Sequence, residues 1–299
     1  MNRIIIVLVI SFILLGCENN TQSSSDKIHK PLVKSNVIYG SDDRKDLYQV
    51  EDANLLALAS STVALMRSET IEVLNNDEVR ILGSNFGSRY NLCESEPYRQ
   101  QDSAAFCSGF LVAPNKIVTA GHCISDSNCN KTKFVFGFAV KEDGKLPSVL
   151  PRDYVYACKK VVRTESFADY GADFAVVELD REVNNFSPLA LRGDGQIQKG
   201  DSVLVIGHPS GLPTKVSGGA QVRDPSPVAY FVANLDTYGG NSGSAVFNSE
   251  TGAVEGILVR GETDYITKEG ANCRVSNVCK DDQCMGEHVT KIEFAKPYL

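Results

Sequence analysis

The sequence predicts an all-β protein, and three observations support this. Short apolar or alternating runs recur from residue 106 onward, with turn residues between them. No clear helical pattern lies between these runs. Apolar residues make up 42% of the 299 residues and charged residues 22%, which leaves ample material for a buried core. Many short strands at this spacing favour an antiparallel barrel or sandwich.

The expected strands begin with a hairpin, in which residues 106–112 lead through Ala113-Pro114-Asn115 into residues 116–120. Further runs predict strands at 134–140, 154–162, 174–179, 202–206, 228–233, 244–247 and 254–259. Residues 53–66 have helix-compatible content that Ser60-Ser61-Thr62 interrupts, so helix and strand both stay open there.

The N-terminus has the pattern of an export signal. Residues 4–15 are apolar except for Ser11, and they follow Arg3. As a helix this run would span about 18 Å, which is short of the roughly 30 Å hydrocarbon core of a bilayer. The pattern therefore predicts a signal peptide over residues 1–16.

The residues that end this run, Leu14-Leu15-Gly16-Cys17, resemble the lipobox of bacterial lipoproteins. The resemblance implies cleavage before Cys17 and lipidation of its thiol, with a plain secretory signal as the alternative. Residues 17–36 are polar and predict a flexible tether. We expect an exported protein, lipid-anchored at the bacterial cell envelope on the outer-membrane or periplasmic face. Release to the extracellular space stays open.

Nine cysteines are many for a cytosolic chain, and export explains them. Without Cys17 an even set remains, consistent with four disulfides: Cys93, Cys107, Cys123, Cys129, Cys158, Cys273, Cys279 and Cys284. The last three, with His288, could instead bind zinc, but their spacings are wider than the usual pair and we expect no metal. The net charge of -7 and the lack of a basic block argue against nucleic acid as a partner.

Three polar residues follow or precede predicted strands in a suggestive order. His122 comes just after the strand at 116–120, Asp173 heads the strand at 174–179, and Ser242 lies between glycines before the strand at 244–247. Each alone has an ordinary interpretation: a structural histidine, a turn carboxylate and a surface loop. Asp169 and Asp180 are neighbouring alternatives to Asp173.

Together the three motifs resemble those of chymotrypsin-like serine proteases. Residues 106–112 followed by Ile117-Val118-Thr119-Ala120-Gly121-His122-Cys123 are similar to their histidine hairpin, Asp173-Phe174-Ala175-Val176 to their aspartate strand, and Gly240-Asn241-Ser242-Gly243 to their nucleophile loop. The order is also theirs. The bacterial glutamyl-endopeptidase-like branch is nearest, because it shares Val37-Ile38-Tyr39-Gly40 and Gly207-His208-Pro209.

The resemblance implies two antiparallel β-barrels with the active site between them, and a serine endopeptidase without a cofactor. It implies Ser242 as nucleophile, His122 as general base, Asp173 as its orienting partner, and the N–H groups of Gly240 and Ser242 as the oxyanion hole. It also implies a disulfide between Cys107 and Cys123.

Asn241 departs from chymotrypsin, which has an aspartate here that pairs with a newly cut N-terminus. An amide cannot supply that charge, so activation by this ion pair is not expected. Members of the branch with asparagine mature by trimming to a residue such as Val37, which would release the domain from a lipid at Cys17. We expect the tethered form, with the released form as the alternative.

The resemblance places the substrate pocket at Asp236, Thr237, Val259, Arg260 and Gly261. If Asp236 points inward, it selects Arg or Lys before the scissile bond; the alternative is a loop carboxylate bonded to nearby N–H groups. Glutamyl endopeptidases place a histidine on the strand after the serine, and Ile257, Leu258 and Val259 stand there instead. Arg260 could neutralise Asp236 or recognise an acidic side chain itself.

The predicted organisation is a signal peptide (1–16), a lipidated tether (17–36), an N-terminal extension with the first barrel (37–190) and a second barrel with the C-terminal segment (191–299). We expect a monomer that acts on proteins or peptides and touches the membrane through its lipid. The alternatives are a glutamate-specific endopeptidase, hydrolysis of small esters, and a catalytically silent binding lipoprotein with a protease fold.

Overall fold

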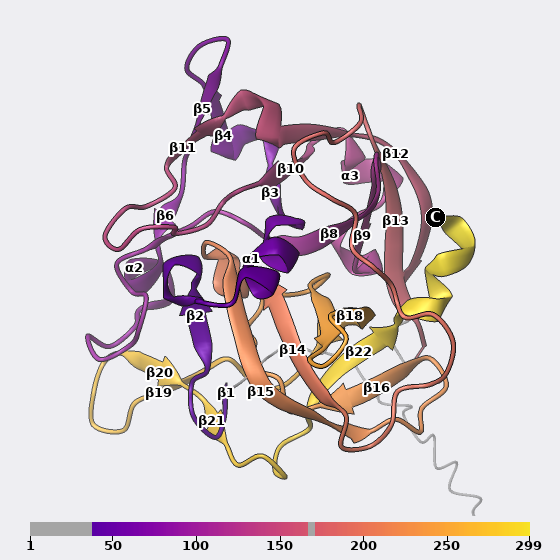
Figure 1. Ribbon diagram of the computed structural model, residues 1–299. Coiled ribbons are helices and arrows are strands. Elements are labelled where there is room, and N and C mark those ends of the chain that lie inside the picture. Colours follow the sequence, from indigo (N-terminus) through magenta and orange to yellow (C-terminus); the bar gives the residue numbers. More distant parts are fainter. Residues whose placement is uncertain (1–37, 167–170) are drawn as a thin grey trace, which may run out of the picture. The chain divides into compact units, whose positions relative to one another are not determined.

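A computed structural model describes residues 38–166 and 171–299, and these consist mostly of strands. Most of the strands form two closed antiparallel barrels (Figure 1). The predicted all-β fold with two barrels is therefore confirmed. The signal peptide, Cys17 and the tether lie outside the described residues, as does Asp169. No helix within the described ranges is long and apolar enough to cross a membrane.

The first barrel has the strand order β10-β12-β13-β9-β8-β3 and closes on itself, since β10 also pairs with β3. It contains the histidine hairpin and the strand that Asp173 begins. Its strands are β3 (Thr62–Arg67), β8 (Cys107–Ala113), β9 (Lys116–Thr119), β10 (Thr132–Phe136), β12 (Val155–Ser166) and β13 (Asp173–Leu179).

The second barrel has the order β14-β17-β18-β22-β16-β15 and closes through the pairing of β14 with β15. Its strands are β14 (Ser202–Gly207), β15 (Lys215–Asp224), β16 (Tyr230–Ala233), β17 (Ala245–Asn248), β18 (Val254–Arg260) and β22 (Glu287–Lys291). Figure 1 shows β14, β15, β16, β18 and β22 together in the lower part of the view.

Four small sheets and three short α-helices lie outside the two barrels in the described residues. The sheets are β11-β5-β4 (Val149–Pro151, Glu78–Ile81, Ile71–Val73), β6-β7 (Ser84–Asn85, Asp102–Ser103), β19-β20 (Tyr265–Thr267, Arg274–Ser276) and β1-β21 (Ile38–Tyr39, Val278–Cys279). The α-helices are α1 (Ala53–Ser60), α2 (Phe86–Tyr90) and α3 (Asp126–Cys129).

The region that the sequence left open, residues 53–66, contains both a helix and a strand. Asp52 caps α1 by accepting from the backbone N–H of Asn54 at 2.7 Å, and the helix ends at Ser60. The following strand β3 has only apolar or small side chains up to Met66, all buried in the first barrel. A cap and a buried apolar run thus separate the two elements.

The N-terminal segment pairs with the second barrel. Strand β2 (Arg44–Asp46) adds to the outer side of β15, although the sequence groups residues 37–190 with the first barrel. A buried ion pair and a hydrogen bond fix this contact: Lys215 Nζ on β15 lies 2.6 Å from Asp46 Oδ1 and donates to Gln101 Oε1 at 2.8 Å. The pairing brings residues 38–46 close to the loop before Ser242.

Four disulfides link the eight cysteines that follow the tether: Cys93–Cys273, Cys107–Cys123, Cys129–Cys158 and Cys279–Cys284. The second is the pair that the resemblance implies. The three cysteines considered for zinc are all disulfide-bonded, so no free thiolate is left there to bind the metal. This number of disulfides is typical of exported proteins.

Candidate active site

His122 and Asp173 meet because their strands are neighbours. β9 and β13 are antiparallel, with Thr119 opposite Ala175, so the residues just after β9 face the start of β13. His122 Nδ1 lies 2.8 Å from Asp173 Oδ2, and the backbone N–H of His122 donates to Oδ1 at 3.2 Å. The carboxylate therefore fixes both the ring and the backbone of the histidine.

The second barrel also holds this aspartate. The backbone N–H of Asp173 donates to Thr290 Oγ1 on β22 at 3.1 Å. Asp173 is 4% exposed, whereas the side chain of His122 is 18% exposed. The imidazole thus has a buried, oriented side toward Asp173 while part of the ring remains open to solvent.

Ser242 lies where the two barrels touch. Its backbone carbonyl accepts from the N–H of Ser108 on β8 at 2.8 Å and lies 3.6 Å from Sγ of Cys123, the residue after His122. Ser108 Oγ also donates to the carbonyl of Gly240 at 2.8 Å. Ser108, which sequence reasoning missed, therefore holds the loop that contains Ser242 against the hairpin that precedes His122.

The turn around Ser242 depends on its glycines. Gly243 has φ of 92°, and a Cβ there would lie 2.1 Å from the carbonyl of Ser108. Gly240 has φ of 97°, which L side chains rarely adopt. Within the described residues, the N–H groups of Gly240 and Ser242 donate to no protein acceptor. Both donors are thus available to a ligand oxygen, as an oxyanion hole requires.

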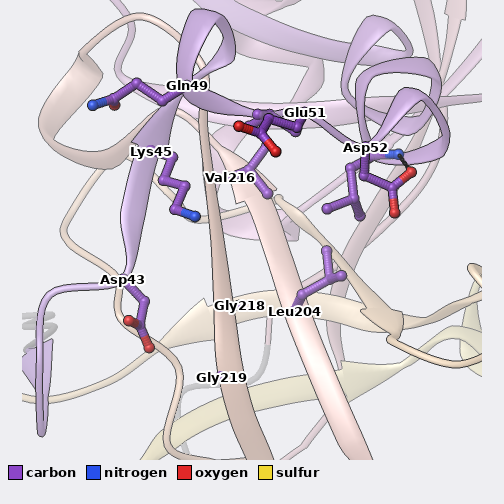
Figure 2. A pocket seen from close by; sticks show the side chains of 11 residues that line it. Asp43, Lys45, Gln49, Glu51, Asp52, Leu204, Val216, Gly218 and Gly219 are labelled. Atoms are coloured by element: carbon purple, nitrogen blue, oxygen red, sulfur yellow. Dashed lines mark hydrogen bonds between the residues drawn. The ribbon is translucent and has the colours of Figure 1, made fainter.

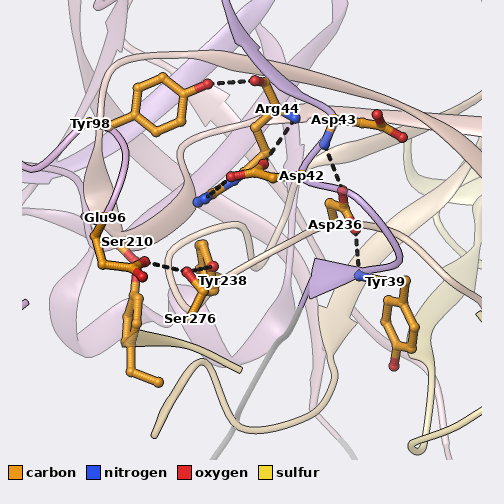
Figure 3. A network of polar contacts seen from close by, with 11 residues as sticks. Tyr39, Asp42, Asp43, Arg44, Glu96, Tyr98, Ser210, Asp236, Tyr238 and Ser276 are labelled. Atoms are coloured by element: carbon orange, nitrogen blue, oxygen red, sulfur yellow. Dashed lines mark hydrogen bonds and ion pairs between the residues drawn. The ribbon is translucent and has the colours of Figure 1, made fainter. Parts of the chain in front are cut away.

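Asp236 is engaged by the N-terminal segment. Its Oδ1 accepts from the N–H of Tyr39 at 2.7 Å and its Oδ2 from the N–H of Asp43 at 2.9 Å, as Figure 3 shows. Burial raises the pKa of Asp236 to about 7, although both hydrogen bonds favour the charged form. This geometry is the loop-carboxylate alternative. It does not support the other alternative, in which Asp236 points inward and binds a substrate cation.

Arg44 packs beside this contact. Its guanidinium forms an ion pair with the carboxylate of Asp42 at 2.6 Å. It also lies over the ring of Tyr238, 4.3 Å from the ring centroid. Tyr98 donates its hydroxyl hydrogen to the carbonyl of Arg44 at 2.5 Å (Figure 3). The N-terminal segment is thereby locked onto the loop that precedes Ser242.

Two of the remaining expected pocket residues, Thr237 and Gly261, lie against the carboxylate of Glu287, which sequence reasoning missed. Thr237 donates its hydroxyl hydrogen to Glu287 Oε2 at 2.7 Å, and Gly261 lies against the same carboxylate. Val259 is buried, and Arg260 stands opposite His288 in the β18–β22 ladder. The signal that could have revealed Glu287 is an acidic residue inside an otherwise buried strand, β22.

His208 is structural in this arrangement. It is fully buried, its Nδ1 lies 3.0 Å from the carbonyl of Leu212, and its ring stacks on Phe138. Burial lowers the pKa of His208 to about 4, so the imidazole is neutral at physiological pH. Its own backbone N–H donates to Ser108 Oγ at 2.9 Å, which orients the hydroxyl that binds Gly240.

A separate cleft of about 560 Å³ lies between the N-terminal segment and strands β14 and β15 (Figure 2). Its lining includes Asp43, Lys45, Glu51, Leu204 and Val216, and none of the three triad candidates. Its charges are mixed, and nothing in it resembles acyl-transfer machinery. The candidate active site therefore remains at the junction that carries Ser242.

Comparison with known proteins finds relatives among peptidases. Residues 107–257 match the family model described as "Trypsin-like peptidase domain". Two curated relatives are each 24% identical: the glutamyl endopeptidase of Bacillus licheniformis over 181 residues, and the extracellular metalloprotease of Bacillus subtilis over 190 residues. The alignments cover 57% and 58% of this chain, and 55% and 59% of those proteins. The chain thus spans somewhat more than half of their length.

Among solved structures, the VesB protease of Vibrio cholerae is similar in fold, with a TM-score of 0.51 at 14% identity. That match covers 88% of this chain and 66% of the other. Because the family model matches slightly more than half of the 299 residues, this chain belongs to the trypsin-like peptidase family.

Proposed function

We propose that this protein is a serine endopeptidase with Ser242 as nucleophile, His122 as general base and Asp173 as the residue that orients the histidine. The observation that carries the proposal is the 2.8 Å contact between His122 Nδ1 and Asp173 Oδ2, beside the backbone of Ser242. A lone serine hydroxyl is a poor nucleophile at neutral pH and needs such a base.

In the proposed reaction, the Ser242 hydroxyl oxygen bonds to the scissile carbonyl carbon while its proton passes to His122 Nε2. The imidazolium then gives this proton to the leaving amine, and the C–N bond breaks to leave an acyl-enzyme. Water then attacks the carbonyl carbon of the acyl-enzyme, with His122 again as general base. The ester bond to Ser242 breaks and the carboxylic acid product is released. The N–H groups of Gly240 and Ser242 would stabilise the oxyanion, and one such donor contributes about 3 to 4 kcal/mol.

The test is covalent labelling with an organophosphate, which reacts with activated serines. We expect modification of Ser242 in the wild type and no modification in Ser242→Ala, with peptide mapping by mass spectrometry as the readout. Ester hydrolysis by the same machinery would give the same label. An unlabelled wild type would instead favour the catalytically silent binding protein, because the triad residues would be present without working geometry.

We also propose a preference for Arg or Lys before the scissile bond. The acidic residues at the end of β18 and the start of β22 favour a cation over a glutamate side chain, even though one relative is named a glutamyl endopeptidase. Arg260 is the residue that would instead favour an acidic side chain.

A further proposal concerns the N-terminus, where Cys17 would carry the lipid that tethers a monomeric domain to the envelope. Mass spectrometry of the membrane fraction tests it. We expect the N-terminal peptide to begin at a lipid-modified Cys17, whereas an unmodified Cys17 or a start at Val37 would contradict the tethered form.

A further inference from the structure

Glu287 is the first residue of a strand in the second barrel, β22. β22, which it begins, pairs with β18, and β18 in turn pairs with β17 directly after Ser242. The backbone N–H of Gly243 donates to the carbonyl of Leu258 on β18 at 2.7 Å. Glu287 therefore lies one strand away from the candidate nucleophile.

The carboxylate of Glu287 fills the space beside Gly261, the residue that follows β18. A Cβ at Gly261 would lie 1.9 Å from Oε1 and 2.1 Å from Oε2. On another side Thr237, five residues before Ser242, donates to Oε2 at 2.7 Å. The carboxylate thus sits between the loop that leads to the nucleophile and the backbone that follows β18.

Glu287 is 0% exposed, yet its hydrogen bonding is incomplete. Within the described residues Oε1 accepts no hydrogen bond of normal geometry, and no lysine or arginine forms an ion pair with this carboxylate. The hydroxyl of Thr237 and, less strongly, the backbone N–H of Glu262 favour its charged form. Burial raises the pKa of Glu287 well above its usual range, and the charges of Asp264 and Glu262 raise it further. A buried carboxyl group with one oxygen left unsatisfied is costly for the fold even when it is protonated, so its presence points to a partner that arrives with the ligand.

Two partly exposed carboxylates precede Glu287 on the same side. Glu262 and Asp264 follow Gly261, and Asp264 Oδ2 accepts from the N–H of Gly239 in the nucleophile loop at 3.1 Å. Arg274 and Arg44 both act on Asp264 electrostatically, and Arg274 also donates to the carbonyl of Tyr265 at 3.0 Å. The charges of Glu262 and Asp264 both raise the pKa of Glu287, so the two carboxylates lie close enough to Glu287 to disfavour an anionic side chain there.

We infer that Glu287 is the specificity-determining residue of the proposed peptidase, and that its carboxylate pairs with a lysine or arginine side chain before the scissile bond. The inference rests on Ser242 acting as the nucleophile. Thr237 orients one oxygen of the carboxylate, and the partnerless Oε1 accepts from the substrate cation. Asp236, which stands nearer to Ser242 in the sequence, takes no part because the backbone of the N-terminal segment uses both of its oxygens.

The test is steady-state cleavage of peptides that differ only in the residue before the scissile bond: Arg, Lys, Gln, Leu or Glu. We expect the wild type to prefer Arg and Lys over Gln by about 100-fold in kcat/KM, which corresponds to one well-formed buried charge pair. Glu287→Gln should lose about 100-fold on Arg and Lys and change about threefold or less on Gln and Leu. A wild type that prefers Glu or Leu, or a variant that keeps the Arg/Gln ratio, would overturn the inference.

Glu255→Gln is the matched control. Glu255 is also a buried carboxylate, but it lies near the start of β18 and is ion-paired with Arg192, whereas Gly261, which Glu287 contacts, follows the end of that strand. The variant should lose stability and keep the Arg/Gln ratio of the wild type. Loss of the ratio in Glu255→Gln as well would assign the Glu287 effect to general damage and so refute the inference.

Stability separates a binding role from a structural one. Because the pKa of Glu287 is raised above its unfolded value of 4.5, its contribution to stability is complete at low pH and is lost as pH rises. Relative to the wild type, Glu287→Gln should therefore gain stability as the pH rises above the unfolded pKa of 4.5, as measured by urea unfolding. A variant that becomes relatively less stable over this range would show that the carboxylate holds the fold together.

A probe of the wild type alone completes the test. Benzamidine, an amidinium cation, should slow organophosphate labelling of Ser242, whereas the neutral benzamide should not. If the wild type is labelled but benzamidine gives no protection, the Glu287 inference fails and the proposed serine peptidase stands. If the wild type is not labelled at all, the proposed function itself fails.

Discussion

Asp173→Asn should lower kcat by about 10⁴-fold while the protein stays folded. The carboxylate accepts from His122 Nδ1 at 2.8 Å and from the histidine backbone N–H at 3.2 Å. With its oxygen accepting from the backbone N–H of His122, an asparagine would donate an amide N–H to Nδ1, so the ring would carry its proton on Nε2, which then cannot accept the proton of Ser242. The measurement is kcat on an Arg-containing peptide, with circular dichroism to verify folding.

Asp180→Asn is the control for this prediction. Asp180 ends the same stretch of sequence and is a possible alternative partner for the histidine, but its exposed carboxylate accepts from the N–H of Ala157 at 3.0 Å and pairs with Arg181. We expect its kcat within about twofold of the wild type, since an exposed pair of this kind contributes little. An Asp173→Asn variant that retained a tenth of the wild-type kcat would contradict the proposed role of Asp173.

Much of the fold follows from the pattern of apolar runs. All nine strands expected from residue 106 onward have counterparts, because alternating or continuous apolar side chains bury one or both faces of a barrel strand. The hairpin of β8 and β9 is an example, since its turn residues and buried Phe110 and Val118 agree with one another. In this hairpin the apolar pattern of the sequence predicts the same buried residues that pack in the barrel.

Two strands of the second barrel escape such reasoning. β15 contains Gly218 and Gly219, and its ladder with β14 is irregular between Val203 and Val205. β22 begins with Glu287 and His288, both buried, so its apolar signal is weak. These strands form through long-range pairing, and neither pairing partner can be deduced from a single stretch of sequence.

The order of the sequence motifs was enough to predict that His122 and Asp173 lie together. It could not predict the contacts between residues that are far apart in the sequence. His122 and Asp173 come together as expected, through the adjacency of β9 and β13. The pocket could not be predicted from motif order. Asp236 accepts a hydrogen bond from Tyr39, almost two hundred residues earlier in the chain, and Glu287, near the C-terminus, contacts Gly261. Contacts at such separations leave no periodic trace in the sequence.

Lys215→Met should lower the free energy of unfolding by about 3 to 5 kcal/mol, because it leaves the buried charge of Asp46 without its partner. The side chains of Lys215 and Asp46 are 1% and 3% exposed, and their charged atoms are 2.6 Å apart. Urea unfolding of the wild type and the variant measures the loss. The same variant should weaken the β2–β15 pairing that presents Tyr39 and Asp43 to Asp236.

The double variant Lys215→Met with Asp46→Leu distinguishes an ion pair from simple packing. Removing both charges takes away the buried unpaired carboxylate, so at least half of the lost stability should return. If the N-terminal segment positions the nucleophile loop through Asp236, kcat should fall in Lys215→Met and recover in the double variant in parallel with stability. A double variant as unstable as the single one would mean that the methylene stem of Lys215, rather than its charge, holds β2 on the second barrel.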